Sequence, residues 1–238
     1  VICFVDDYSR RHVALYFLTR KSDAAHALRK DIDEHATPPQ TKLRAVQIDG
    51  GGEFEGEFKT VCTMLGIRRQ ISSADLQQQN SVAERTWSTI VSAALRMMED
   101  AQLPAKYYED AFDAAAWIKN RLYSTTLTGM TPHEAMWSKK PDLSLLKVWG
   151  SPAYIHTKPG KNIRTADELK TAARKKLNSE VRPVIFVGYA GEYKAWTFHD
   201  PVANMYLTSR AALFNERVGV NTPTLTLLKQ PHTDARKH

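Results

Sequence analysis

Two acidic residues of this sequence stand where a regular element meets a loop. Asp49 follows the apolar stretch 43–48 and precedes three glycines, and Glu84 falls in the first turn of a long predicted helix. A polar side chain that ends a strand lies at the carboxyl edge of a sheet, where ligands of α/β proteins bind. Carboxylate oxygens are preferred ligands of hard divalent cations. The arrangement of the pair therefore suits a divalent metal ion shared by Asp49 and Glu84.

Each of these acids also has a simpler structural interpretation. An Asp-Gly pair is common turn chemistry, because the Asp side chain can hydrogen-bond the backbone two residues further on. The spacing of Ser81 and Glu84 fits a capping box, in which the glutamate folds back onto the amide of the cap residue. Glu84 is about 100° away from the apolar seam of its helix, so it borders the core without entering it. On spacing alone, the turn and capping roles remain open beside metal binding.

The elements that must position these acids can be read from the hydrophobic pattern. Runs of β-forming residues predict strands, and apolar residues three and four positions apart predict helices. Glycine at position 66 predicts a helix end, because glycine tolerates the left-handed backbone found there. The expected order is strands 1–5 and 12–18, helix 22–35, strand 43–48, helix 53–65, strand 67–71, a long helix from Ser81, and a helix over 103–123.

From residue 147 onward the hydrophobic pattern alternates, as in strands. Five short strands separated by turns are enough for a small closed barrel. The stretch 127–146 predicts a linker with one short helix over 132–137. The stretch 158–182 is rich in basic residues, for which a solvated charged face is favoured over a DNA contact. The final stretch, 218–238, has no periodicity and is expected to be a disordered tail. The expected strands are at 148, 152–156, 184–189, 195–199, 205–209 and 211–214.

Several motifs resemble the integrase core of copia-type retrotransposons. Val46 to Phe54 is similar to the family's xxDNGGEF segment, and Gln78 to Arg85 is similar to its PQQNGVAER segment. The sequence departs from these motifs at Gly50, Gln77 and Ser81, where the family has Asn, Pro and Gly. Further similar segments lie at residues 4–10, 120–121, 131–134, 139–150, 186–189 and 200–216.

This resemblance implies a ribonuclease H-like α/β core, a mixed sheet flanked by helices, followed by a Src-homology-3-like barrel. It implies that Asp49 and Glu84 are the second and third members of an Asp-Asp-Glu triad that binds Mg²⁺ or Mn²⁺. By the same alignment the first Asp and the first strand precede Val1. Asp6 and Asp7 are therefore assigned to a hairpin, and the chain as it stands is expected to be catalytically inactive. The expected domains are a truncated catalytic core over 1–126, the linker over 127–146, the barrel over 147–217 and the tail over 218–238.

The composition is that of a basic globular protein. The 238 residues are enough for one large or two modest domains, and the 42% that are apolar can build a hydrophobic core. The 33 basic and 26 acidic residues give a net charge of +7. A positive charge suits a polyanionic partner, since phosphate contacts supply most of the sequence-independent affinity for DNA. No apolar run approaches the roughly 20 residues of a membrane span, and no signal peptide opens the chain. Cys3 and Cys62 are too few for a zinc module and predict reduced thiols of an intracellular protein.

Two function classes remain open: an integrase-type polynucleotidyl transferase, and a non-catalytic nucleic-acid-binding or interaction module with the same fold. For the first, the resemblance implies DNA as the partner, both the element ends and the target, a homo-oligomer as the working form and the nucleus as its location. Basic and amide side chains near the two acids are candidates for DNA contacts. These candidates are Arg68, Arg69, Gln78, Gln79, Asn80 and Arg85, with Arg96, Lys119 and Arg121 as further candidates for phosphate contacts.

Overall fold

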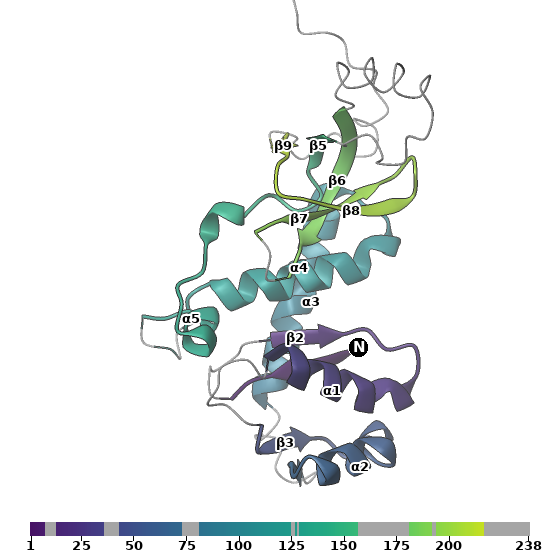
Figure 1. The fold of residues 1–238 in the computed structure, drawn as a ribbon, viewed down its shortest axis with the longest axis vertical. Helices are drawn as coiled ribbons and strands as arrows, with labels where there is room; N and C mark the ends of the chain where they lie inside the picture. Colours follow the sequence, from purple (N-terminus) through teal and green to yellow (C-terminus); the bar gives the residue numbers. More distant parts are fainter. Residues whose placement is uncertain are drawn as a thin grey trace, which may run out of the picture. The chain divides into compact units, whose positions relative to one another are not determined.

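The chain divides into two compact units. A computed structural model describes residues 1–7, 13–35, 43–72, 81–124, 127, 129–156, 181–191 and 194–216. One unit is made of residues 1–93 and 115–142, and the other of residues 94–114 and 143–238. Two helices, α3 (Ser81–Ala101) and α4 (Tyr108–Arg121), contribute residues to both units. Each unit has strands of its own (Figure 1).

The first unit begins with an antiparallel hairpin. β1 (Ile2–Val5) pairs with β2 (Val13–Tyr16), so that Ile2 lies opposite Tyr16. A 3-10 turn (Lys21–Asp23) leads into α1 (Ala24–His35). The predicted hairpin and the helix after it are thus confirmed, while residues 8–12 between its two strands lie outside the described residues.

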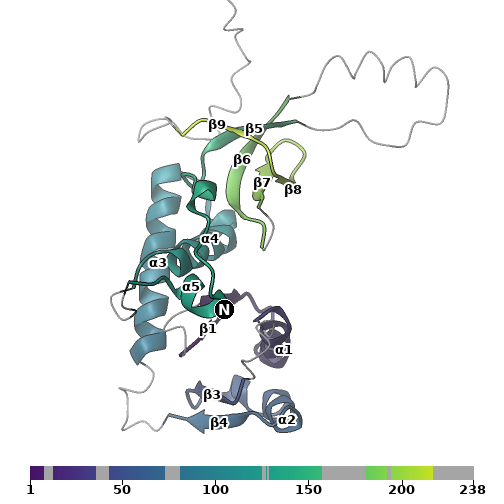
Figure 2. The same ribbon diagram turned by 60° about the vertical axis from the view of Figure 1, so that its left-hand side comes forward.

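A parallel pair of strands follows. β3 (Ala45–Ile48) and β4 (Arg68–Ile71) are connected by α2 (Glu57–Met64), and Figure 2 shows the helix beside the two strands. Parallel neighbours need such a crossover because both strands run in the same direction. Beyond the helix, Gly66 adopts a φ of +67°, and Ile67 N donates to Cys62 O at 2.8 Å, as predicted for a glycine at this end. The helix predicted over 53–65 is divided, because a 3-10 turn (Gly52–Phe54) precedes α2.

Both pairs of strands pack on one core. Leu28, Phe58 and Val61 are almost fully buried there, and side chains of β1 and β3 pack against them. Within the described residues the strands form two separate two-stranded ladders, β1-β2 and β3-β4. The mixed sheet expected from the sequence is therefore present as an antiparallel part and a parallel part that meet through the side chains of a common core.

The second unit contains a five-stranded antiparallel sheet. Its order is β8-β7-β6-β5-β9. Phe186 lies at the centre of its core, with ring centroids 6.1 Å from Phe198 and 5.6 Å from Phe214. The strands are β5 (Pro152–His156), β6 (Val181–Tyr189), β7 (Trp196–Asp200), β8 (Met205–Ser209) and β9 (Leu213–Phe214).

The expectation of a closed barrel was wrong for the described part of the chain. No ladder joins β8 to β9 there, so the sheet has two edges. The reason is the length of β9, which has two residues and pairs only with Ala153 and Tyr154 of β5. The strand expected at Val148 is absent, whereas the helix α5 (Pro132–Trp137) is found where it was predicted. The basic stretch, apart from its last two residues, and the tail lie outside the described residues.

The two cysteines are inert in this fold. Both are free thiols, and burial raises the pKa of Cys3 to about 11, an effect that Lys119 opposes. Burial likewise raises the pKa of Cys62. Thiols of this kind stay protonated and unreactive at neutral pH.

None of the helices in the described ranges combines the length and apolar character that crossing a lipid bilayer requires.

Candidate functional site

Asp49 lies at the end of β3, directly after the buried Ile48. Its side chain is exposed, and its Oδ1 accepts a hydrogen bond from Gly51 N at 3.2 Å. The turn role foreseen for this Asp-Gly pair is therefore present. A turn bond of this kind occupies one of several lone pairs on the carboxylate, so it fixes the side chain and leaves it able to accept a further ligand.

Glu53, to which the sequence assigned no chemistry, lies beside Asp49 in the structure. A Cβ placed on Gly51 would stand 2.8 Å from Glu53 Oε2 and 3.0 Å from Asp49 Oδ1. The two oxygens can be no farther apart than these distances combined, about 6 Å. The backbone of Gly51, with φ −65° and ψ 137°, is open to any residue, so glycine is needed here for space. The signal in the sequence was a second acid just beyond a run of glycines.

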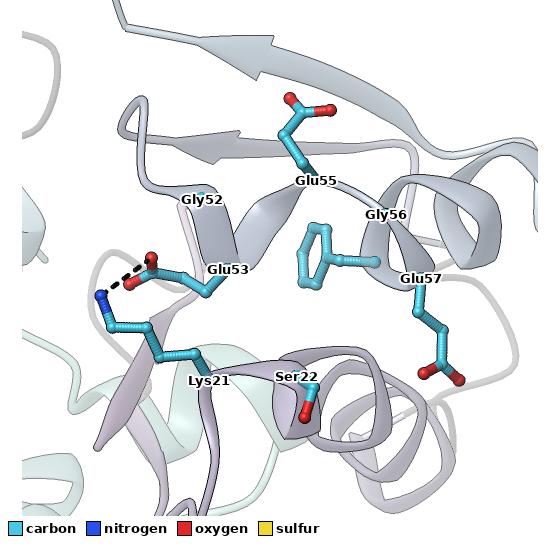
Figure 3. A pocket seen from close by; sticks show the side chains of 8 residues that line it. Lys21, Ser22, Gly52, Glu53, Glu55, Gly56 and Glu57 are labelled. Atoms are coloured by element: carbon cyan, nitrogen blue, oxygen red, sulfur yellow. Dashed lines mark ion pairs between the residues drawn. The ribbon is translucent and has the colours of Figure 1, made fainter.

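A hollow of about 350 Å³ opens beside Glu53. Figure 3 shows Lys21 reaching towards Glu53, and the two charged groups form an ion pair of 3.8 Å. The Lys21 side chain is 85% exposed, so this pair contributes little to stability. The hollow is lined by Lys21, Ser22, Gly52, Glu53, Glu55, Gly56, Glu57 and Phe58.

Glu84 lies in the first turn of α3 and is exposed. It makes no hydrogen bond to any described residue, and the Ser81 hydroxyl instead accepts from Arg85 Nη2 at 3.2 Å. The capping box is therefore not formed between Ser81 and Glu84. No hydrogen bond or ion pair links Asp49 to Glu84, and the described part of the chain holds no group of three or more His, Cys, Asp or Glu side chains suited to a metal. A shared metal site of these two acids stays a prediction.

The two arginines of β4 have different surroundings. Arg69 Nη1 donates to Phe54 O at 2.6 Å and to Glu55 Oε1 at 3.2 Å, and its side chain is only 15% exposed. Arg69 thus holds the loop that follows Asp49. Arg68 is exposed on the same strand. Of the two, Arg68 has the surroundings expected of a phosphate contact.

Four other residues were also candidates for contacts with DNA. Gln78, Gln79 and Asn80 lie outside the described residues. The guanidinium of Arg121 stacks on the Trp117 ring at 3.5 Å and donates to Trp117 O at 3.1 Å, so its position serves packing.

Residues 166–226 match the family model described as the retroviral polymerase SH3-like domain. The retrovirus-related Pol polyprotein from transposon TNT 1-94 of Nicotiana tabacum is 30% identical over 216 residues, which is 90% of this chain and 15% of that protein. The corresponding polyprotein from transposon RE2 of Arabidopsis thaliana is 28% identical over 219 residues, 91% of this chain and 14% of that protein.

A solved structure is similar at lower identity. It is the simian T-cell lymphotropic virus intasome in complex with PP2A regulatory subunit B56 gamma, with 19% identity and a TM-score of 0.48. The similarity covers 87% of this chain and 68% of that chain.

The chain joins an α/β unit, with an acid at the end of a parallel strand, to a β region that matches the retroviral polymerase SH3-like model, and this combination places it in the class of retrovirus-related Pol proteins. The chain is a homologue of the Pol polyproteins of copia-type plant retrotransposons. It spans about a seventh of the length of these relatives, 15% and 14% of the two polyproteins named.

Proposed function

We propose that this chain is part of a metal-dependent polynucleotidyl transferase, an integrase that processes the DNA ends of a retroelement and joins them to target DNA. The observation that carries the proposal is the position of Asp49 at the end of β3, with an oxygen of Glu53 within about 6 Å across Gly51. Homology to retrotransposon Pol polyproteins supports an integrase-like role.

The donor set beside Gly51 fits a hard divalent cation. Mg²⁺ takes oxygen ligands at about 2.0–2.1 Å, so two ligands of one ion lie about 4 Å apart or less. The Glu53 side chain can approach Asp49 to that distance by rotation, because its partner Lys21 is exposed and easily exchanged. Asp49 and Glu84 would hold the ion, with Glu53 in reach as a further ligand. A bound divalent cation activates a hydroxyl or water and neutralises charge on the reacting phosphodiester.

Other residues of the chain would orient the acids and bind DNA. The hydrogen bond from Gly51 N orients the Asp49 carboxylate, and Arg69 holds the loop that carries Glu53. Exposed basic residues such as Arg68 would bind the phosphates of DNA, which is the partner we propose. We further propose a homo-oligomer as the working form and the nucleus as its place of action, since both DNA partners of such a reaction meet there.

The second candidate function is a non-catalytic nucleic-acid-binding module. The observation that favours it is the position of Glu84, which joins no group of potential metal ligands in the part of the chain that is described. A module of this kind would bind DNA with the same basic surface and would need no divalent ion for binding.

Strand transfer decides between the two functions. Labelled oligonucleotides with the element's ends are incubated with the protein, as this chain and within the whole Pol polyprotein, in Mg²⁺ or Mn²⁺. Asp49→Asn within the polyprotein should abolish joining while DNA affinity persists, because a neutral amide is a weaker metal ligand. Asp33→Asn, an exposed acid of α1, is the matched control and should retain full activity. Undiminished joining by Asp49→Asn, or DNA binding without joining in the intact polyprotein, would refute the transferase.

A further inference from the structure

A second hollow, of about 410 Å³, lies between α3 and α4 in the first unit. Its lining contains two cations and three hydroxyl groups and no carboxylate: Arg85, Thr86, Ser88, Thr89 and Lys119. Apolar ligands and metal cations are poorly matched to such a lining. An oxyanion is well matched, because ammonium, guanidinium and hydroxyl groups all donate hydrogen bonds to it.

The spacing on α3 explains why these groups converge. Residues three and four positions apart share one face of a helix, so Arg85, Ser88 and Thr89 lie together. Lys119 comes from α4, where the next residue, Asn120, is anchored by two buried hydrogen bonds to Val13 of β2. The helix turn that carries Lys119 is therefore fixed against the hairpin before any ligand binds.

The hydrogen bonds of Arg85 leave it a donor for a ligand. Arg85 uses Nε and Nη2 to donate to Ser81 O at 3.0 Å and Ser81 Oγ at 3.2 Å, which holds the guanidinium in place with its Nη1 group uncommitted to Ser81. The Thr89 hydroxyl donates to Arg85 O at 2.8 Å, so Thr89 serves as a wall. The ammonium of Lys119 and the hydroxyl of Ser88 also line the hollow.

We propose that this hollow binds a phosphodiester group of a DNA strand. Two cations around one hollow suit a singly charged phosphodiester, and Ser88 is one helical turn, about 6 Å along the axis, from Glu84. A phosphate held here would be a near neighbour of the one placed at the acidic residues. The identity of the ligand as DNA rests on the proposed function, whereas the phosphate chemistry rests on the lining alone.

The test is DNA affinity as a function of salt. A short fluorescein-labelled duplex is titrated with the whole chain in EDTA, so that metal binding at Asp49 has no part in the result. One lost phosphate contact should make the slope of log K against log salt shallower by about 0.9, and should weaken binding about fivefold near 0.15 M salt. We expect this change for Lys119→Gln and a slope close to wild type for Lys119→Arg.

A second pair of variants tests the same hollow by repulsion. Ser88→Asp places a carboxylate in the lining and should weaken binding by at least as much as Lys119→Gln. Ser92→Asp makes the same change one turn further along α3, at an exposed position outside the lining, and is the matched control. Circular dichroism checks that all four variants melt like the wild type.

Phosphate competition and the strand-transfer assay separate the possible outcomes. Replacing chloride by inorganic phosphate at equal ionic strength should weaken DNA binding by the wild type more than by Lys119→Gln, if the hollow holds a phosphate group. Unchanged affinity and slope for both Lys119→Gln and Ser88→Asp would overturn the inference. Absence of strand transfer would count against the proposed function only, because binding in EDTA does not require catalysis.

Discussion

The side chain of Asn120 pairs with the backbone of Val13 as a neighbouring strand would. Asn120 Nδ2 donates to Val13 O at 2.8 Å, and Val13 N donates to Asn120 Oδ1 at 2.8 Å. The two residues are 4% and 3% exposed, and 107 positions separate them in the sequence. One carboxamide on α4 thereby satisfies both backbone groups of a residue in β2 and ties the helix to the hairpin.

Asn120→Asp should therefore destabilise the first unit. The substitution replaces the Nδ2 donor by an oxygen that would face Val13 O, and it buries a charge without a partner. We expect a loss of roughly 2–4 kcal/mol in the free energy of unfolding, measured by urea denaturation. Asn204→Asp is the control, because Asn204 is exposed and accepts a hydrogen bond that an Asp can also accept. Equal losses in both variants would contradict the pairing role.

Gly51→Ala should weaken divalent-metal binding without unfolding the protein. A Cβ there would collide with Glu53 Oε2 and crowd Asp49 Oδ1, so both carboxylates must move away. We expect a several-fold weaker Mn²⁺ affinity by calorimetry and a nearly unchanged melting temperature, since the backbone of Gly51 suits alanine. Gly52→Ala is the control, because nothing lies within 4 Å of its added Cβ. A Gly51→Ala variant with wild-type Mn²⁺ affinity would show that the Asp49 and Glu53 carboxylates do not bind the metal together.

Arg69→Gln should lower stability, whereas Arg68→Gln should lower DNA affinity. Arg69 bonds the carbonyl of Phe54 and the carboxylate of Glu55, so its loss should lower the free energy of unfolding by about 1–3 kcal/mol. Arg68 is exposed, so its loss should leave stability within about 0.5 kcal/mol and reduce DNA affinity. Urea denaturation and the fluorescein-duplex titration measure the two effects. A stability loss confined to Arg68→Gln would reverse these assignments.

The stability of the second unit should fall as the pH drops from 7.5 towards 5.5. His199 is buried, with Nδ1 2.8 Å from Tyr107 Oη and Nε2 3.3 Å from Asn204 Oδ1. Burial, and then Lys106, lowers its pKa below the ordinary 6.5, while Asn204 and Asp200 oppose that shift. As the pH falls through about 6.5, His199 therefore becomes protonated in the unfolded chain before it does so in the folded chain. Unfolding is favoured by at most about 1.4 kcal/mol per pH unit below that point.

The control for this pH dependence is His199→Gln. It should be less stable at pH 7.5, with a flatter profile down to pH 5.5 in urea denaturation followed by tryptophan fluorescence. His133→Gln serves as a second control, because the pKa of His133 in the first unit is also lowered, mainly by burial. A profile for His199→Gln as steep as that of the wild type would show that other groups cause the pH dependence.

Much of the local structure was predictable from the sequence. Thr131 caps α5 by accepting a hydrogen bond from Glu134 N at 3.1 Å, with Pro132 in the first turn, and the helix has the predicted bounds. β5 and β8 also match their predicted ranges, because alternating residues define them without help from distant parts of the chain. The expected closure of the barrel failed because β9 has only two residues and forms no ladder with β8 within the described part of the chain.

The sequence by itself determined the order of the elements and the acid at the end of β3, since caps, turns and hydrophobic periods act within a few residues. Its motifs also showed the kinship. Only the tertiary structure decided that Glu53 lies beside Asp49, that Arg69 holds a loop while Arg85 and Lys119 face one hollow, and that Asn120 completes β2. The physical reason is distance: hydrogen bonds, ion pairs and steric contact act over a few ångströms in space. The sequence does not state which distant residues come that close.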